Sequence, residues 1–153
     1  MKNTTLCYLE KDGKYLMLLR NKKEIDENKG KWIGVGGKFE AGESPEDCLI
    51  REVKEETGLD LIQYKLRGIV TFILNEKEAE YMFLYTADNY EGQIKECNEG
   101  KLAWIEKDMV SDLNLWEGDK IFLRLLKENA PFFSLKLNYR DDELIDSKIK
   151  IYG

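Results

Sequence analysis

Short runs of alternating or continuous apolar residues predict that this chain is built mainly of β-strands. Gly-containing turns at residues 11–14 and 91–92 and a charged turn at residues 75–78 separate the runs. Residues 20–31 are polar and predict a loop, and residues 32–39 are Gly-rich with strand character only at their ends. Strands are expected over residues 4–9, 15–19, 62–74, 80–87, 101–106, 132–139 and 143–151.

Two segments have helical rather than strand periodicity. Ser44-Pro45 is a good N-cap and first-turn pair, and Gly58 is typical of the residue that ends a helix, so a helix is predicted over about 44–57. Its apolar residues Leu49, Ile50 and Val53 are expected to pack on a core. A second helix is expected within 111–128 before Pro131, with its inner side formed by Ile121, Phe122, Leu125 and Leu126.

This order of elements predicts an α/β fold in which helices cover both faces of a sheet. The last two expected strands flank Arg140-Asp141-Asp142 and predict a C-terminal β-hairpin. With 153 residues and no linker or repeat, we expect one domain spanning residues 1–153.

The charge balance narrows the possible partners. Asp and Glu total 30 against 24 Lys and Arg, a net charge of −6, which argues against nucleic acid polymers and anionic membranes as partners. A small phosphorylated substrate remains compatible, because a bound cation reverses the local field. No apolar run is long enough to span a bilayer. The sequence assigns no oligomeric state.

Two residue types narrow the possible chemistry. The chain has no histidine, which excludes catalysis by a His base, a Ser-His-Asp triad and His-ligated zinc. Its three scattered cysteines are typical of reduced thiols in a cytoplasmic protein.

The most informative segment is residues 37–59, GKFEAGESPEDCLIREVKEETGL. On the predicted helix, the i, i+3, i+4 spacing of Glu52, Glu55 and Glu56 gathers three carboxylates within one turn. Like charges about 5 Å apart repel by roughly 1 kcal/mol in water and about 3 kcal/mol at an effective dielectric near 20. Arg51 offsets part of this repulsion, and Mg²⁺, which prefers carboxylate and water oxygens, would offset the rest.

Glutamate-rich helices are more often solvated surfaces than metal sites. Here the context favours the metal site, because Gly36-Gly37 precedes the helix, Glu43 lies at the loop exit and Arg51 adjoins the acids.

This segment resembles the Nudix box, the signature of the Nudix hydrolases. Its fixed positions are Gly37, Glu43, Arg51-Glu52, Glu55-Glu56 and Gly58, with aliphatic Val53 and Leu59. The resemblance implies an α/β/α sandwich around a mixed sheet. It also implies hydrolysis of a nucleoside diphosphate linked to another group, usually with Mg²⁺, for which Mn²⁺ can substitute.

The resemblance also implies roles for individual residues. Glu52 is the expected base, Glu55 and Glu56 are the main metal ligands, and the Gly37 carbonyl is a further ligand. Arg51 holds the glutamates in place and so belongs to the catalytic group, and Glu43 supports the loop and helix. Either Glu96 or Glu99, in a downstream loop, is expected to supply a further acid. Alignment on Trp104 favours Glu99 as this metal ligand.

Beyond the box, the runs KGKWIGVGGKFEAGE, WEGDKIF and FFSLKL resemble the MutT-like branch, which includes hydrolases of oxidised purine nucleoside triphosphates. The chain departs from those hydrolases at two positions. Where this chain has Ile33 they have an Asn that reads the base, and where it has Gly118, directly before Asp119, they have a second acid. Phe72 and Trp116 could instead be core residues, and Lys22 could instead be a solvated surface charge. The resemblance implies substrate-binding positions at Lys22, Ile33, Lys38, Phe72, Trp116 and Asp119.

The leading hypothesis is a Mg²⁺-dependent diphosphatase that releases pyrophosphate and a nucleoside monophosphate from an ordinary or oxidised nucleoside triphosphate, in nucleotide-pool sanitation. One alternative is a Nudix pyrophosphatase for ADP-ribose or a nucleotide sugar. The other is a non-catalytic Nudix-like domain that senses a nucleotide, although such domains typically lose box glutamates that are intact here.

Overall fold

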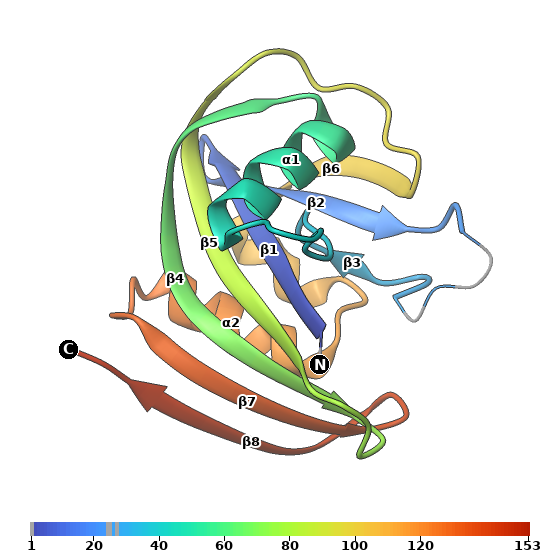
Figure 1. Cartoon of the computed structure of the whole chain (residues 1–153), viewed down its shortest axis with the longest axis vertical. Helices are drawn as coiled ribbons and strands as arrows, with labels where there is room; N and C mark the ends of the chain where they lie inside the picture. Colours follow the sequence, from blue (N-terminus) through green and yellow to red (C-terminus); the bar gives the residue numbers. More distant parts are fainter. Residues whose placement is uncertain (1, 24–25, 27) are drawn as a thin grey trace.

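A curved mixed β-sheet lies between two helices in the computed structural model, which describes residues 2–23, 26 and 28–153 (Figure 1). No helix in these ranges is long and apolar enough to cross a bilayer. The elements are β1 (Lys2–Lys11), β2 (Lys14–Arg20), β3 (Trp32–Ile33), α1 (Pro45–Thr57), β4 (Asp60–Leu74), β5 (Glu80–Glu91), β6 (Gly100–Glu106), the 3₁₀ helix η1 (Lys107–Asp112), α2 (Glu117–Lys127), β7 (Phe133–Arg140) and β8 (Glu143–Ile151).

The strand order is β3-β2-β1-β5-β4-β7-β8, and β6 pairs with β2. β1 runs parallel to β5 and β4 parallel to β7, while the other pairs are antiparallel. The predicted mixed sheet is therefore confirmed. The strands at residues 15–19, 80–87 and 143–151 lie inside β2, β5 and β8, and the C-terminal hairpin is β7–β8.

Each face of the sheet has its own apolar core. Along β1, Leu6 and Tyr8 face the core that includes α2, whereas Cys7 and Leu9 face the core that includes α1. This alternation follows from the two-residue period of a strand. It confirms the α/β/α sandwich.

Helix α1 begins and ends where its sequence predicts. The Ser44 hydroxyl accepts a hydrogen bond from the Asp47 N–H, the Asp47 carboxylate accepts one from the Ser44 N–H, and Gly58 takes a left-handed φ of 83°. The core-facing prediction was wrong for Ile50, whose side chain is 41 % exposed. The buried stripe follows Leu49, Val53 and Glu56 at i, i+4 and i+7, so the third position on it is an acid rather than an apolar residue.

The second predicted helix is present and lies within the expected range 111–128. Residues 107–112 form η1, and α2 begins only at Glu117, after a break that directs Leu115 and Trp116 into the core. The inner side of α2 is as expected, with Phe122, Leu125 and Leu126 buried and Ile121 packed against them.

Replacing Ser44 with Ala should lower the free energy of unfolding by about 1 kcal/mol, because the first turn of α1 loses its side-chain acceptor. Chemical denaturation followed by circular dichroism measures this. Ser111→Ala, at an exposed position in η1, is the matched control and should change stability by less than about 0.5 kcal/mol. Equal losses in both variants would show that the cap does not stabilise α1.

Candidate active site

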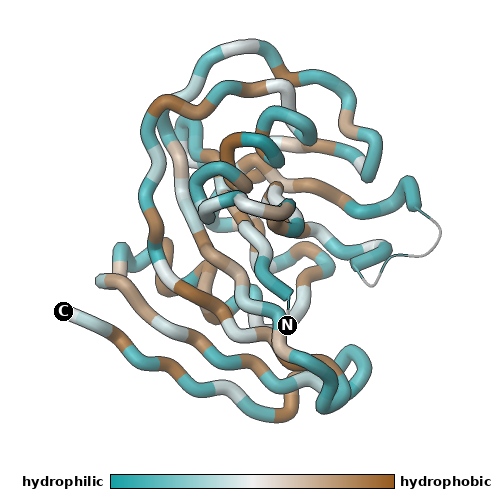
Figure 2. Tube along the Cα trace, in the orientation of Figure 1, coloured by the Kyte–Doolittle hydropathy of each residue, from teal (hydrophilic) through white to brown (hydrophobic). Residues whose placement is uncertain are grey.

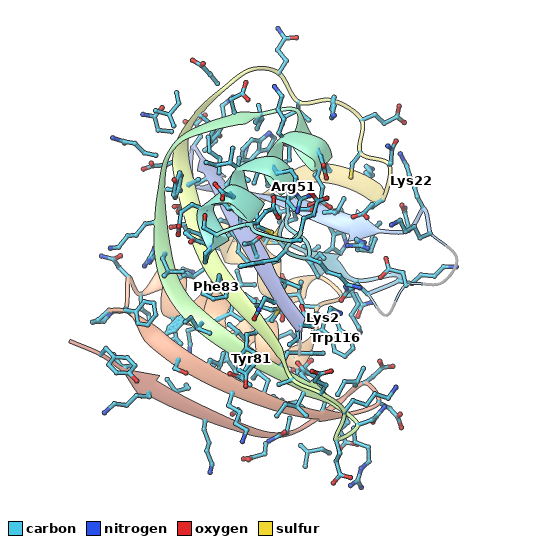
Figure 3. The ribbon with its side chains drawn as sticks, in the orientation of Figure 1. Lys2, Lys22, Arg51, Tyr81, Phe83 and Trp116 are labelled. Atoms are coloured by element: carbon cyan, nitrogen blue, oxygen red, sulfur yellow. The ribbon has the colours of Figure 1, made fainter. Side chains whose placement is uncertain are left out.

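One pocket of about 700 Å³ connects an acidic end with an aromatic end. Its acidic end includes Glu52 and Glu99, and its aromatic end includes Phe72 and Trp116. Arg51 lies beside carboxylate oxygens on α1, and Trp116 lies at the start of α2 on the other side of the sheet (Figure 3).

The acidic end depends on two glycines that bring the backbone close to neighbouring groups. A Cβ on Gly36 would lie 2.0 Å from the Thr5 carbonyl oxygen, and a Cβ on Gly37 would lie 2.6 Å from the Glu52 carboxyl carbon. The Thr5 N–H donates to the Gly37 carbonyl at 2.9 Å. Only glycine therefore lets this segment lie between β1 and the Glu52 carboxylate.

Arg51 is the main counter-charge of the acidic cluster. Its Nε and Nη2 donate to the two carboxylate oxygens of Glu43 at 2.7 and 2.9 Å, and its Nη1 donates to Glu52 at 2.7 Å and Glu55 at 3.2 Å. The hydrogen bonds from Arg51 and the N–H of Glu40 lower the Glu43 pKa to about 2. Such bidentate pairs fix direction as well as charge, so Arg51 holds the box acids in a defined arrangement.

Glu56 is buried beneath the Gly-rich segment. Its Oε1 accepts a hydrogen bond from the Gly36 N–H at 2.6 Å, whereas its Oε2 has no partner in the described part of the chain. Burial, followed by the effect of the neighbouring Glu99 carboxylate, raises the Glu56 pKa. Burial also raises the Glu52 pKa, against the lowering effect of Arg51.

Glu99 supplies an acid from outside the helix. Its carboxylate accepts from Lys23 Nζ at 2.9 Å and lies 3.4 Å from Arg20 Nη1. Burial acts to raise the Glu99 pKa, but the neighbouring Glu56, the hydrogen bond from Lys23 and the Arg20 charge lower it overall. Glu96, the other candidate, has a side chain 90 % exposed beside Lys22.

The donor set fits a hard divalent cation. Glu52, Glu56 and Glu99 supply carboxylate oxygens, which Mg²⁺ prefers, and the unpartnered Glu56 oxygen is a polar atom that a cation would satisfy. Within residues 2–23, 26 and 28–153, no three Asp, Glu or Cys side chains already converge on one metal position. Two of these carboxylates already have cationic partners, Glu52 in Arg51 and Glu99 in Lys23.

The aromatic end is a packed group of rings. Trp116 lies edge-to-face with Phe72 at 5.4 Å and with Tyr139 at 5.0 Å between ring centroids. Its Nε1 donates to Asn28 Oδ1 at 2.8 Å, and Lys31 Nζ lies 4.7 Å from its ring centroid. Trp116 is therefore a core residue whose accessible part lines the pocket.

Asp119 is a buried acid beside this group. Burial raises its pKa from 3.8 to about 8, although Lys31 acts in the opposite direction, so the carboxyl is mostly protonated at neutral pH. The preceding residue, Gly118, has no room for a side chain. A Cβ there would lie 2.5 Å from a Leu137 methyl carbon and 2.8 Å from the Tyr139 hydroxyl oxygen.

Comparison with known proteins assigns a family to this arrangement. The profile of the NUDIX domain matches residues 2–126. The chain belongs to the Nudix family. It is 38 % identical over 124 residues to the Uncharacterized Nudix hydrolase YvcI of Bacillus subtilis, covering 78 % of this chain and 75 % of that one. It is 30 % identical over 121 residues to the Oxidized purine nucleoside triphosphate hydrolase of Danio rerio, covering 78 % of each.

The fold agrees with this assignment. A crystal structure of a MutT protein from Bacillus halodurans superposes with a TM-score of 0.88 at 29 % identity, covering 98 % of each chain. The protein is thus a Nudix hydrolase with the α/β/α sandwich expected from its sequence.

The Nudix pocket contains most of the residues that the sequence singles out. Four of them do not line it. Lys22 Nζ donates to the Cys97 carbonyl, and the Glu55 side chain is 57 % exposed beside Arg51. The other two are Arg51 and the buried Glu56. The Gly37 carbonyl already accepts from the Thr5 N–H and the Cys48 thiol. The sequence-predicted residues that line the pocket are Ile33, Gly37, Lys38, Glu52, Phe72, Glu99, Trp116 and Asp119.

Sequence reasoning missed Arg20, Lys23 and Asn28, which contact the acidic and aromatic ends of the Nudix pocket. They lie in or beside the polar segment 20–31, which has no periodicity that would assign its side chains a direction. Their partners Glu99 and Trp116 are more than 70 residues away, at separations of 76 and 88 for Lys23 and Asn28. Only the tertiary fold reveals these pairs.

Replacing Asp119 with Asn should flatten the pH dependence of stability between about pH 4 and pH 8. Because the folded state raises the Asp119 pKa from 3.8 to about 8, it binds the proton more tightly than the unfolded state. The resulting stability is complete below about pH 4 and is lost as pH rises through 8, at up to about 1.4 kcal/mol per pH unit.

Urea denaturation across this range measures the difference. Asp112→Asn, an exposed control, should keep the slope of the unchanged protein. An Asp119→Asn slope identical to that of the unchanged protein would show that Asp119 is ionised throughout.

Proposed function

We propose that this Nudix hydrolase cleaves a nucleoside triphosphate, ordinary or oxidised in its purine, to a nucleoside monophosphate and pyrophosphate with Mg²⁺. The observation that carries the proposal is the continuity of one pocket of about 700 Å³ from Glu52 of α1 and Glu99 to the rings around Trp116. A nucleotide needs both ends, because its phosphates require charge neutralisation and its base requires an apolar contact surface.

The acidic end has groups suited to hydrolysis of a phosphoanhydride. Mg²⁺ bound there would neutralise phosphate oxygens and lower the pKa of a coordinated water. The Glu52 carboxylate lines the pocket, and its raised pKa makes it a better proton acceptor than an exposed glutamate. Lys23 and Arg20 also line the pocket and bring positive charge toward the phosphates. Arg51 keeps Glu52 oriented through their hydrogen bond of 2.7 Å.

The aromatic end supports a purine substrate. Phe72 and Trp116 offer ring edges, and the protonated Asp119 carboxyl can donate a hydrogen bond to an acceptor on the base. Ile33 adds apolar surface and no amide, and the close packing around Gly118 excludes a second acid. The similarity to the Danio rerio oxidised-purine hydrolase agrees with a purine, while Ile33 and Gly118 favour a base contact centred on Asp119 alone.

A substrate panel tests the proposal. Purified protein with Mg²⁺ should release pyrophosphate from dGTP, dATP or their oxidised forms with kcat/KM at least tenfold above that for ADP-ribose and nucleotide sugars. Faster turnover of ADP-ribose would favour the alternative Nudix pyrophosphatase. Binding of a nucleotide with no turnover of any compound would favour the sensing domain.

Replacing Glu52 with Gln should lower kcat by about 10²–10⁴-fold and weaken nucleotide affinity far less, because the amide keeps the shape and one oxygen for the cation but cannot accept the proton. Steady-state pyrophosphate release and nucleotide binding by calorimetry give the two quantities. Glu128→Gln removes an exposed carboxylate at the end of α2 and should leave both unchanged. A Glu52→Gln variant with full kcat would transfer the base role to another residue.

A further inference from the structure

β8 (Glu143–Ile151) forms one edge of the sheet and pairs with β7 on its inner side. Figure 1 shows it as the outermost strand at the bottom of the molecule. In the ranges that the structure describes, no strand pairs with its outer side. A nine-residue edge of this kind presents a row of backbone donors and acceptors that can pair with another chain.

Apolar side chains reach this edge without being covered. Ile145, Ile149 and Ile151 are 55 %, 43 % and 46 % exposed. Hydrophobic and hydrophilic segments alternate along the strand (Figure 2). Ile149 and Ile151 lie opposite Leu135 and Phe133 of β7, both of which are buried in the α2-side core. The apolar face of the sheet thus continues to its edge and ends there half-exposed.

The charges of β8 identify which chain would cover it. The acids Glu143 and Asp146 lie toward its N-terminal end, and Lys148 and Lys150 toward its C-terminal end. An antiparallel copy of the same strand would oppose acid to base, whereas a parallel copy would oppose like charges. We propose that β8 pairs antiparallel with β8 of a second copy of this chain, about a two-fold axis at Ser147.

This register is selected by direct opposition of charges. With the axis at Ser147, Asp146 of each copy lies opposite Lys148 of the other, giving two ion pairs. Ile145 lies at a register shift in β8 and has no partner on β7, so the pairing rests on residues 146–148. Moving the axis to Asp146 or Lys148 would place two identical charges directly opposite each other. Lysines on an edge strand usually discourage pairing with another chain. Here Asp146 neutralises Lys148 of the second copy when the axis is at Ser147, so pairing in this register is favourable.

The proposed interface is separate from the Nudix pocket. None of the β8 residues lines the pocket. Eight residue pairs with β7, interrupted by one register shift, hold β8 in place, and none of them involves the Glu52 cluster. Pairing through β8 therefore leaves the site open, and variants on this strand should retain the hydrolase activity measured for the unchanged protein.

Charge exchange tests the pairing. Asp146→Lys and Lys148→Asp should each weaken the dimer at least about tenfold, because two attractive pairs become repulsive. The double variant Asp146→Lys/Lys148→Asp restores opposite charges and should recover dimerisation. Analytical ultracentrifugation of the full chain from micromolar to millimolar concentration gives the dissociation constants. Asp112→Lys, which makes the same charge change in η1, should have no comparable effect.

Cysteine crosslinking tests the position of the axis. Antiparallel opposite residues have Cα atoms about 4.5–5.5 Å apart, within the range that a disulfide spans. Ser147→Cys should therefore form a covalent dimer under mild oxidation. Lys150→Cys should not, because its two copies would lie about 20 Å apart along the paired strands. The three native cysteines are buried and give little background.

A chain that stays monomeric throughout the concentration range, with no Ser147→Cys crosslink, would overturn the proposal. A dimer that is unaffected by the single charge changes would also overturn it, by locating the interface elsewhere. Circular dichroism and pyrophosphate release from each variant confirm that the fold is intact.

Discussion

The guanidinium of Arg51 is the contact on which the acidic site depends. It joins Glu43 in the loop before α1 to Glu52 and Glu55 on the helix, and it also donates to the Lys38 carbonyl at 2.9 Å. Without this cation the carboxylates would repel one another, and the segment from Gly37 to α1 would lose its main tie to the helix. The proposed divalent-cation site is thus held together by the positive charge of Arg51.

The two ends of the pocket are connected by the polar segment after β2. Arg20 pairs with Asp26, whose carboxylate accepts from the Asn28 N–H, and Asn28 in turn accepts from Trp116. Arg20 also lies beside Glu99 at the acidic end. A continuous set of polar contacts therefore runs from the acids to the base-side rings, so the geometry of one end constrains the other.

Local patterns predicted the local structure well and the tertiary pairs poorly. The caps at Ser44 and Gly58 defined α1, and strand alternation defined the two-faced sheet. The spacing of Leu49, Ile50 and Val53 is compatible with either Leu49 or Ile50 facing the core beside Val53. The position of the sheet against α1 determines that Leu49 is buried and Ile50 exposed. The acids of the box are fixed by helix geometry, whereas Arg20, Lys23 and Asn28 reach the site through a loop whose direction no periodicity encodes. The Asp119 environment likewise depends on burial, which sequence spacing does not determine.

We propose that the acids around Glu56 form the metal end of a nucleotide pocket. Crystals soaked with Mn²⁺ and measured for anomalous scattering test this most directly. We expect a peak within coordination distance of Glu52 and Glu56, beside the unpartnered Oε2 of Glu56. Manganese bound elsewhere, with these carboxylates empty, would contradict it.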